Sequence, residues 1–266
     1  AVVMGATMAI IMIGFMWGMY PNRRTNIGIV AGSVAVFAGA LLFPQTASVR
    51  DPGALGARYA ALFRARGGQE LRAAVRAVEP RGEGWAIRHE NGEVLASAVV
   101  MAAGVWSAAL LRPLGYRVPM VAERGYHTHY AGADGAWLNR PVYDVARSYV
   151  IAPTDRGLRV TTGVELAAVD APPRPDQTRL AESAAREAIA LGVPKQDAPW
   201  LGRRPSLPDG VPMIGAAPRH RGLWLAFGHG HVGFSTGPAT GRLVAEAMEG
   251  GPTFLDLSAF SPARFH

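Results

Sequence analysis

The sequence predicts an α+β protein that carries a helical hairpin at its N-terminus. Residues 1–20 and 27–43 are uncharged and almost wholly apolar, and the polar turn 21–26 separates them. From residue 47 on, helical periodicity alternates with short apolar runs that are typical of strands. The chain is 49% hydrophobic, and its 32 Gly and 20 Pro supply many turns. We therefore expect a packed domain over residues 47–266, preceded by a separate hairpin over 1–43.

The two apolar runs have the length and composition of membrane spans. A spanning helix needs about 20 apolar residues, with a lower limit of roughly 17, so the first run fits and the second meets the limit. Gly14 and Gly18 give the first run a ridge of small residues, and Gly28 and Gly32 do the same for the second. We predict a transmembrane hairpin over residues 1–43; a buried hairpin of a soluble protein is the alternative.

Charges around the hairpin bear on its orientation. No basic segment precedes the first run, which argues against a signal peptide. Arg23 and Arg24 favour a cytoplasmic loop between the spans, whereas Arg50 and Arg58 follow the second span. The positive-inside rule therefore does not select one orientation of the hairpin. The expectation is a membrane-associated protein whose catalytic portion is cytoplasmic.

The elements of the second part follow from local patterns. A helix is expected over 52–66, because Leu55, Tyr59, Leu62 and Phe63 share one face and Gly67-Gly68 ends it. Asn91-Gly92 predicts a hairpin with a type I′ turn. The run 98–104 is wholly apolar, as in a strand buried on both faces. Further strands are expected at 71–78, 85–89, 124–130, 148–152, 158–164 and 223–227, and further helices at 105–111, 178–191 and 237–248.

Composition excludes several classes of function. The net charge is +7, yet Lys195 is the only lysine and the arginines are scattered along the chain. A nucleic-acid-binding protein would gather them in a patch, so no nucleic-acid partner is expected. The absence of cysteine excludes disulfides, thiolate metal sites and a cysteine nucleophile.

Two stretches near the C-terminus carry the strongest chemical signal. In residues 203–215, RRPSLPDGVPMIG, Arg204 stands beside a turn that prolines stiffen. In residues 223–233, LWLAFGHGHVG, an apolar strand runs into a glycine-rich turn before the helix expected at 237–248. A guanidinium binds a carboxylate in two-point geometry, and glycine turns expose backbone N–H groups. Together they predict a site for an anionic substrate beside a cofactor.

The glycines of the second stretch match a dinucleotide fingerprint only in form. Gly228, Gly230 and Gly233 have the G-x-G-x-x-G spacing, but no second strand with an acidic end follows them. We interpret the segment as a later strand–turn–helix whose N–H groups and helix N-terminus face an electron-rich edge of a ligand. A tight turn without a ligand is the alternative.

These stretches resemble the C-terminal segment of the FAD-dependent amino-acid oxidoreductases, the family of D-amino acid dehydrogenase and glycine oxidase. Residues 102–107, AAGVWS, are similar to the second segment of that family that contacts FAD. The segments 123–126, 149–153 and 163–165 resemble strands of its substrate domain. The resemblance covers about residues 47–266, with the substrate domain at about 120–200 and the FAD-contact segments at about 70–110 and 201–250.

The resemblance implies a fold, a cofactor and a reaction. The fold is part of an α/β FAD-binding domain joined to a substrate domain with a mixed or antiparallel sheet. The reaction oxidises an amino acid or related amine by hydride transfer from its α-carbon to flavin N5. Arg204 would bind the substrate carboxylate, His231 would be a second substrate contact, and Tyr149 would line the pocket. The implied FAD contacts are Val75, Ala103, Gly104, Trp106, Gly215, Gly228, His229, Gly230, His231, Val232, Gly233, Phe234 and Ser235.

The chain also departs from that family. The family begins with a βαβ unit that carries G-x-G-x-x-G and an acidic residue for the adenosine ribose, and this sequence shows neither. The departure predicts weak uptake of FAD by a truncated or fused enzyme. It also leaves a second hypothesis, a non-catalytic, membrane-anchored fragment.

Histidine spacing leaves a third hypothesis, a metal hydrolase. The pairs His127-x-His129 and His229-x-His231 could each place two imidazoles on one side of a strand. Carboxylates do not cluster beside either pair in the sequence, and no cysteine is present. We therefore expect no metal.

Overall fold

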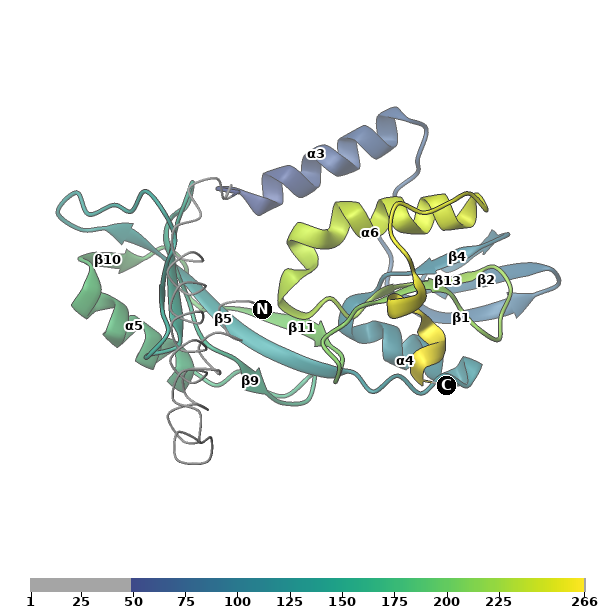
Figure 1. Ribbon diagram of the computed structural model, residues 1–266. Coiled ribbons are helices and arrows are strands. Elements are labelled where there is room, and N and C mark those ends of the chain that lie inside the picture. Colours follow the sequence, from purple (N-terminus) through teal and green to yellow (C-terminus); the bar gives the residue numbers. More distant parts are fainter. Residues whose placement is uncertain (1–48, 266) are drawn as a thin grey trace, which may run out of the picture. The chain divides into compact units, whose positions relative to one another are not determined.

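The computed structural model describes residues 49–265, and Figure 1 shows their arrangement. The predicted hairpin 1–43 lies outside the described residues. Within the described range, no helix combines the length and apolar character needed to cross a membrane. From Arg50 on, the chain forms one compact unit. Its helices and strands form an α+β fold, as the sequence predicts.

The larger sheet is built around the long strand β5 (Val121–Gly132), which has β11 (Trp200–Ser206) beside it in Figure 1. Its strands follow the order β10-β5-β8-β7-β6, and β11 and β9 also pair with β5. Every pairing in this sheet is antiparallel. The remaining strands are β6 (Val142–Asp144), β7 (Tyr149–Thr154), β8 (Gly157–Thr161), β9 (Glu165–Leu166) and β10 (Leu191–Pro194).

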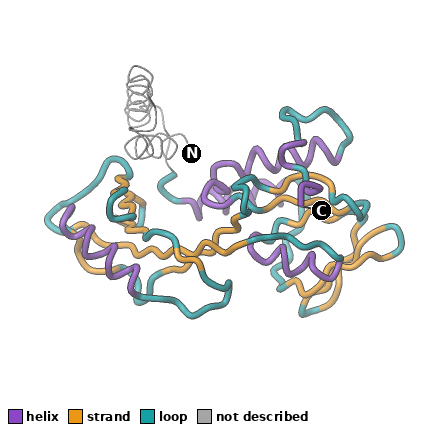
Figure 2. The backbone as a smooth tube through the Cα atoms, turned by 60° about the horizontal axis from the view of Figure 1, so that its bottom comes forward, coloured by secondary structure: helices purple, strands orange, loops and turns teal. Residues whose placement is uncertain are grey.

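Helix α5 (Asp176–Ala188) covers one face of this sheet. Ala181 and Ala185 are buried against the strands, and their small side chains let the helix approach the aromatic and β-branched residues there. The buried residues of this core are Tyr130, Tyr149, Ile151, Leu158, Val160, Ala181, Ala185 and Leu191. In Figure 2 the helix runs beside these strands at the left. The opposite face of the sheet carries the candidate site.

A second, smaller sheet has the order β12-β13-β4. Strand β13 (Leu223–Phe227) is antiparallel to β12 (Met213–Ala216) and parallel to β4 (Val99–Met101). Helix α6 (Gly233–Met248) packs on one face through Leu243 and Val244. On the other face, the main core joins the sheet to the antiparallel sheet β1 (Val75–Arg81), β2 (Gly84–His89) and β3 (Gly92–Ala96), and to α4 (Ser107–Leu111). The period-2 alternation of β13 supplies apolar residues to both layers.

Helix α3 (Pro52–Ala65) lies where the sequence predicts it. The side chain of Asp51 caps it by accepting a hydrogen bond from the N–H of Ala54 at 2.9 Å. Its expected apolar face is not buried by the described residues: Tyr59, Leu62 and Phe63 each remain about half exposed.

Two local expectations need correction. The hairpin between β2 and β3 forms, but its loop is Glu90-Asn91, because Gly92 pairs with His89. Asn91 has no positive φ, so the turn is not type I′. Strand β4 has three residues and is not buried on both faces: Met101 is buried and Val100 is 41% exposed. Among the described strands it pairs only with β13, which leaves its other edge open.

Candidate functional site

Arg204 lies on strand β11, which the sequence analysis did not predict; the expected turn follows it. Strand β11 pairs with β5 so that Arg204 is opposite Glu123 and Gly202 is opposite Gly125. Directly paired residues of an antiparallel sheet project from the same face. Arg204 therefore projects from the face of β5 that carries Glu123, Gly125 and, two residues on, His127.

Two paired glycines make room for large side chains on this face. A methyl group added at Gly125 would lie 2.4 Å from Nη1 of Arg204. One added at Gly202 would lie 2.4 Å from the indole of Trp200. The guanidinium and the indole thus lie directly over the backbone of the two strands, and no other residue type fits at either glycine without displacing them.

Glu123 connects Arg204 with the glycine-rich turn that follows strand β13. Its Oε2 lies 2.6 Å from Nε2 of His231, the middle residue of the short helix η3 (Gly230–Val232), which follows the turn at Gly228. Its charge also acts favourably on the Arg204 guanidinium. The structure therefore brings together Arg204 and His231, both predicted site residues, through an acid that the sequence analysis did not single out. Only the register of β5 against β11 reveals that acid.

The Arg204 guanidinium is partly desolvated and incompletely paired. Burial lowers its pKa from the ordinary value, and the carboxylate of Glu123 opposes that shift. Its Nη1 is buried and has no hydrogen-bond partner among the described residues. A buried donor without a partner costs about 1–3 kcal/mol. A ligand carboxylate would satisfy this donor in a charge-assisted contact.

Both glycine turns predicted to contact a cofactor adjoin the strand of Arg204. Strand β11 contacts η3 and also η1 (Gly104–Trp106), the turn that follows β4. Gly104, Gly228 and Gly230 have φ of 57°, 86° and 52°, a conformation that glycine adopts without strain. Leu207 packs so closely on Gly228 that a Cβ there would lie 2.6 Å from its side chain.

The first turn of α6 can accept an electron-rich group. The helix has no side-chain cap and no acidic residue in its first turn, so its leading N–H groups lack side-chain acceptors. The hydroxyls of Ser235 and Thr236 donate back to the carbonyl of Val232. Large apolar side chains at the two turns are exposed by about half: Trp106, Val232 and Phe234. An aromatic ligand beside the turns would cover them.

The other predicted site residues lie elsewhere. Tyr149 shares a face of β7 with Ile151, in the core beneath α5, and its hydroxyl donates to the carbonyl of Ala184 at 3.3 Å. That face is opposite the face of Arg204, so the structure does not place Tyr149 at the candidate site. Val75 begins β1 and is 41% exposed. Gly215 lies in β12, where an added Cβ would contact Pro262.

The histidine pairs do not assemble a metal centre. His229 contacts the hydroxyl of Thr240 at 2.8 Å, and His231 contacts Glu123 instead. The rings of His127 and His129 are neighbours at 5.1 Å. Within residues 49–265, no three His, Asp or Glu side chains gather as metal ligands.

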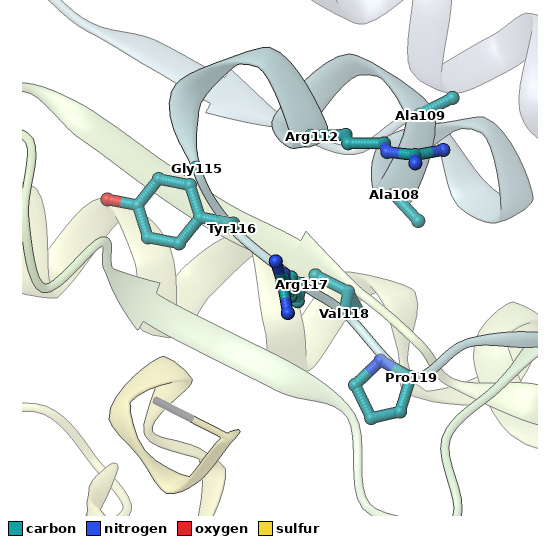
Figure 3. A pocket seen from close by; sticks show the side chains of 8 residues that line it. All are labelled: Ala108, Ala109, Arg112, Gly115, Tyr116, Arg117, Val118 and Pro119. Atoms are coloured by element: carbon teal, nitrogen blue, oxygen red, sulfur yellow. The ribbon is translucent and has the colours of Figure 1, made fainter.

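A pocket of about 720 Å³ lies away from these residues. Figure 3 shows Ala108, Ala109 and Arg112 on one side of it and the segment from Gly115 to Pro119 on the other. None of the predicted site residues lines this pocket. The candidate site is therefore defined by the convergence of β11, β5 and the two glycine turns, and not by this cavity.

Comparison with known proteins identifies the family of the chain. The family model of FAD dependent oxidoreductases matches residues 24–247. A D-amino-acid oxidase of Bradyrhizobium diazoefficiens is 36% identical over 225 residues, which are 81% of this chain and 52% of that protein. A D-amino acid dehydrogenase of Paramagnetospirillum magneticum is 34% identical over 181 residues, 66% of this chain and 42% of that protein.

A solved structure supports the same relationship. Glycine oxidase from Geobacillus kaustophilus matches with a TM-score of 0.62 and 27% identity, over 71% of this chain and 51% of that one. The chain spans about half the length of the curated relatives it matches. The matched range exceeds half of the chain, and the chain therefore belongs to the family of FAD-dependent oxidoreductases.

Proposed function

We propose that this chain provides the substrate-binding part of an enzyme that oxidises an α-amino acid or related amine with FAD. The observation that carries the proposal is the partly desolvated Arg204, whose Nη1 is buried without a partner among residues 49–265. The strand of Arg204 adjoins both glycine turns. A substrate bound there lies between a guanidinium and the turns.

Each side chain has a distinct task in this proposal. Arg204 binds the substrate carboxylate through its guanidinium fork and so orients the α-carbon. Gly125 keeps the space over β5 that the guanidinium needs. Glu123 holds His231 at 2.6 Å and fixes the position of the turn relative to the arginine. Trp200, over Gly202, offers an apolar surface beside the site.

The residues present fit a flavin. The uncapped first turn of α6 offers N–H groups and the positive end of the helix dipole to an electron-rich edge. The turn at Gly104 and the exposed Trp106, Val232 and Phe234 offer backbone and apolar surface to a planar ring. FAD, when bound, supplies the acceptor for the α-hydrogen and its two electrons at flavin N5.

Anaerobic titration tests this function. The full chain is incubated with excess FAD, and amino acids are added while the visible absorbance of the flavin is followed. The proposal predicts flavin uptake and loss of that absorbance on addition of an amino acid but not of its decarboxylated amine. Equal reduction by the amine would refute the role of the carboxylate, and stoichiometric zinc without flavin would favour the hydrolase hypothesis.

A further inference from the structure

A second group of cations lies on the same face of the sheet as Arg204. His127 and His129 follow Gly125 along β5 at two-residue intervals, so all three positions share that face. Arg159 on β8 is paired with His129 and projects from the same face. A cavity of about 310 Å³ opens here, lined by both histidines and by Trp200, Arg156, Arg159 and Arg50.

This cavity is rich in positive charge that the protein does not neutralise. Among the described residues, no carboxylate forms an ion pair with Arg50, Arg156 or Arg159. The Nε of Arg159 is buried and has no hydrogen-bond partner in the described part of the chain. Asp51 also lines the cavity, where its carboxylate accepts the N–H of Ala54, and its single negative charge leaves the three arginines in excess.

The histidines do not add to this charge. Burial, with the nearby Arg159, lowers the pKa of His127 to about 4, and burial also lowers the pKa of His129. Both imidazoles are therefore neutral at neutral pH and serve as hydrogen-bonding or stacking surfaces. The ring of His127 stacks on Trp200 with centroids 4.7 Å apart. This pair forms an uncharged surface along β5 between the level of Arg204 and the level of Arg159.

We propose that the cavity binds a second carboxylate, so that the substrate of this site is a dicarboxylic amino acid. The proposal rests on the proposed function, in which Arg204 binds the α-carboxylate. At about 3.4 Å per residue, His127 lies roughly 7 Å along β5 from Gly125, and the level of Arg159 roughly 14 Å. The charge of Arg159 also acts on His127, so its guanidinium reaches back toward the level of that ring. An extended acidic amino acid, whose two carboxyl carbons lie about 5 Å apart, can span the shorter distance from Arg204 to that level with its methylene groups against Trp200 and His127.

Calorimetric titration of the purified full chain tests this specificity. The ligands are D-glutamate and D-glutamine, which have the same shape and differ in the second carboxylate. Hydrogen bonds to charged groups predict that D-glutamate binds roughly 10-fold to 150-fold more tightly. In Arg159→Gln this preference should fall below about 3-fold while the affinity for D-glutamine stays within about 2-fold.

Matched variants separate the possible outcomes. Arg179→Gln makes the same change on α5, beneath the other face of the sheet, and should keep the full preference. If Arg159→Gln does not fold, the exposed Arg156→Gln replaces it and should reduce the preference several-fold. Equal affinity for both ligands, lost in Arg204→Ala, overturns the second carboxylate site and leaves the proposed function standing. Absence of binding by either ligand overturns both.

Discussion

Replacement of Gly125 by alanine tests the link between the β5 backbone and the arginine. The added methyl group would lie 2.4 Å from Nη1, 2.7 Å from Nη2 and 2.9 Å from Cζ of Arg204. Real Cβ atoms essentially never approach other heavy atoms closer than 3.0 Å, so the guanidinium must move. It forms the far end of a flexible side chain, and the fold can therefore accommodate the change by moving the arginine alone.

The expected effect is large on binding and small on stability. A displacement of about 1 Å at a positioned group costs on the order of 100-fold in rate. We therefore expect amino-acid affinity and kcat/KM to fall by roughly 10-fold to 100-fold. Gly125 does not have a positive φ, so alanine fits its backbone, and the free energy of unfolding should change by less than about 1 kcal/mol.

Calorimetry with an amino acid and thermal unfolding of the same samples measure both quantities. Gly56→Ala is the control, because its methyl group would meet nothing within 4 Å on α3. It should leave amino-acid affinity unchanged. If Gly125→Ala binds amino acids as the unsubstituted chain does and unfolds at the same temperature, the position of the guanidinium over this glycine does not matter and the reasoning is wrong.

Two further predictions concern groups around the site. NMR titration of His127 should give a pKa of about 4. Because the pKa of an unfolded histidine is about 6.5, the unfolded chain binds the proton more readily than the folded chain. The neutral His127 therefore stabilises the fold fully above pH 6.5, and this stabilisation is lost as the pH falls toward 4. A value near 6.5 would contradict the described burial. Tyr126→Phe removes a buried hydroxyl that donates to Glu165 at 2.6 Å and accepts from Arg124, so the free energy of unfolding should fall by about 1–3 kcal/mol, with amino-acid affinity unchanged. The same change at Tyr143, which is 61% exposed, should leave stability unaltered, and an unchanged melting temperature for Tyr126→Phe would count against the buried network.

Local signals predicted the strand–turn–helix at the C-terminus well. The alternation in 223–227 and the glycines after it specify a strand, a turn and a helix without reference to the rest of the chain. The helix begins at Gly233, four residues before the predicted start, because the first turn tolerates Gly-rich sequence once β13 and η3 fix its entry. The family resemblance, and not periodicity, indicated the role of Arg204.

The pairing of strands far apart in the sequence determines features of the site that local sequence patterns do not predict. Strand β11 contains two arginines, a proline and a glycine and has little strand propensity of its own, so it exists because it pairs with β5. The same register brings Glu123 to Arg204. It also assigns Tyr149 to the face under α5, since a shift of one residue would reverse every side chain of a strand.

The most direct measurement of the central claim compares Arg204 variants of the FAD-loaded chain in amino-acid oxidation. Removal of a buried guanidinium that pairs with a carboxylate costs on the order of 2–5 kcal/mol. Arg204→Ala should therefore lower kcat/KM by roughly 30-fold to several thousand-fold, and Arg204→Lys should restore it only in part, because an ammonium lacks the two-point fork. Flavin content should be unchanged in both. A kcat/KM for Arg204→Ala equal to that of the unsubstituted chain would contradict the account and leave Arg204 as a structural residue.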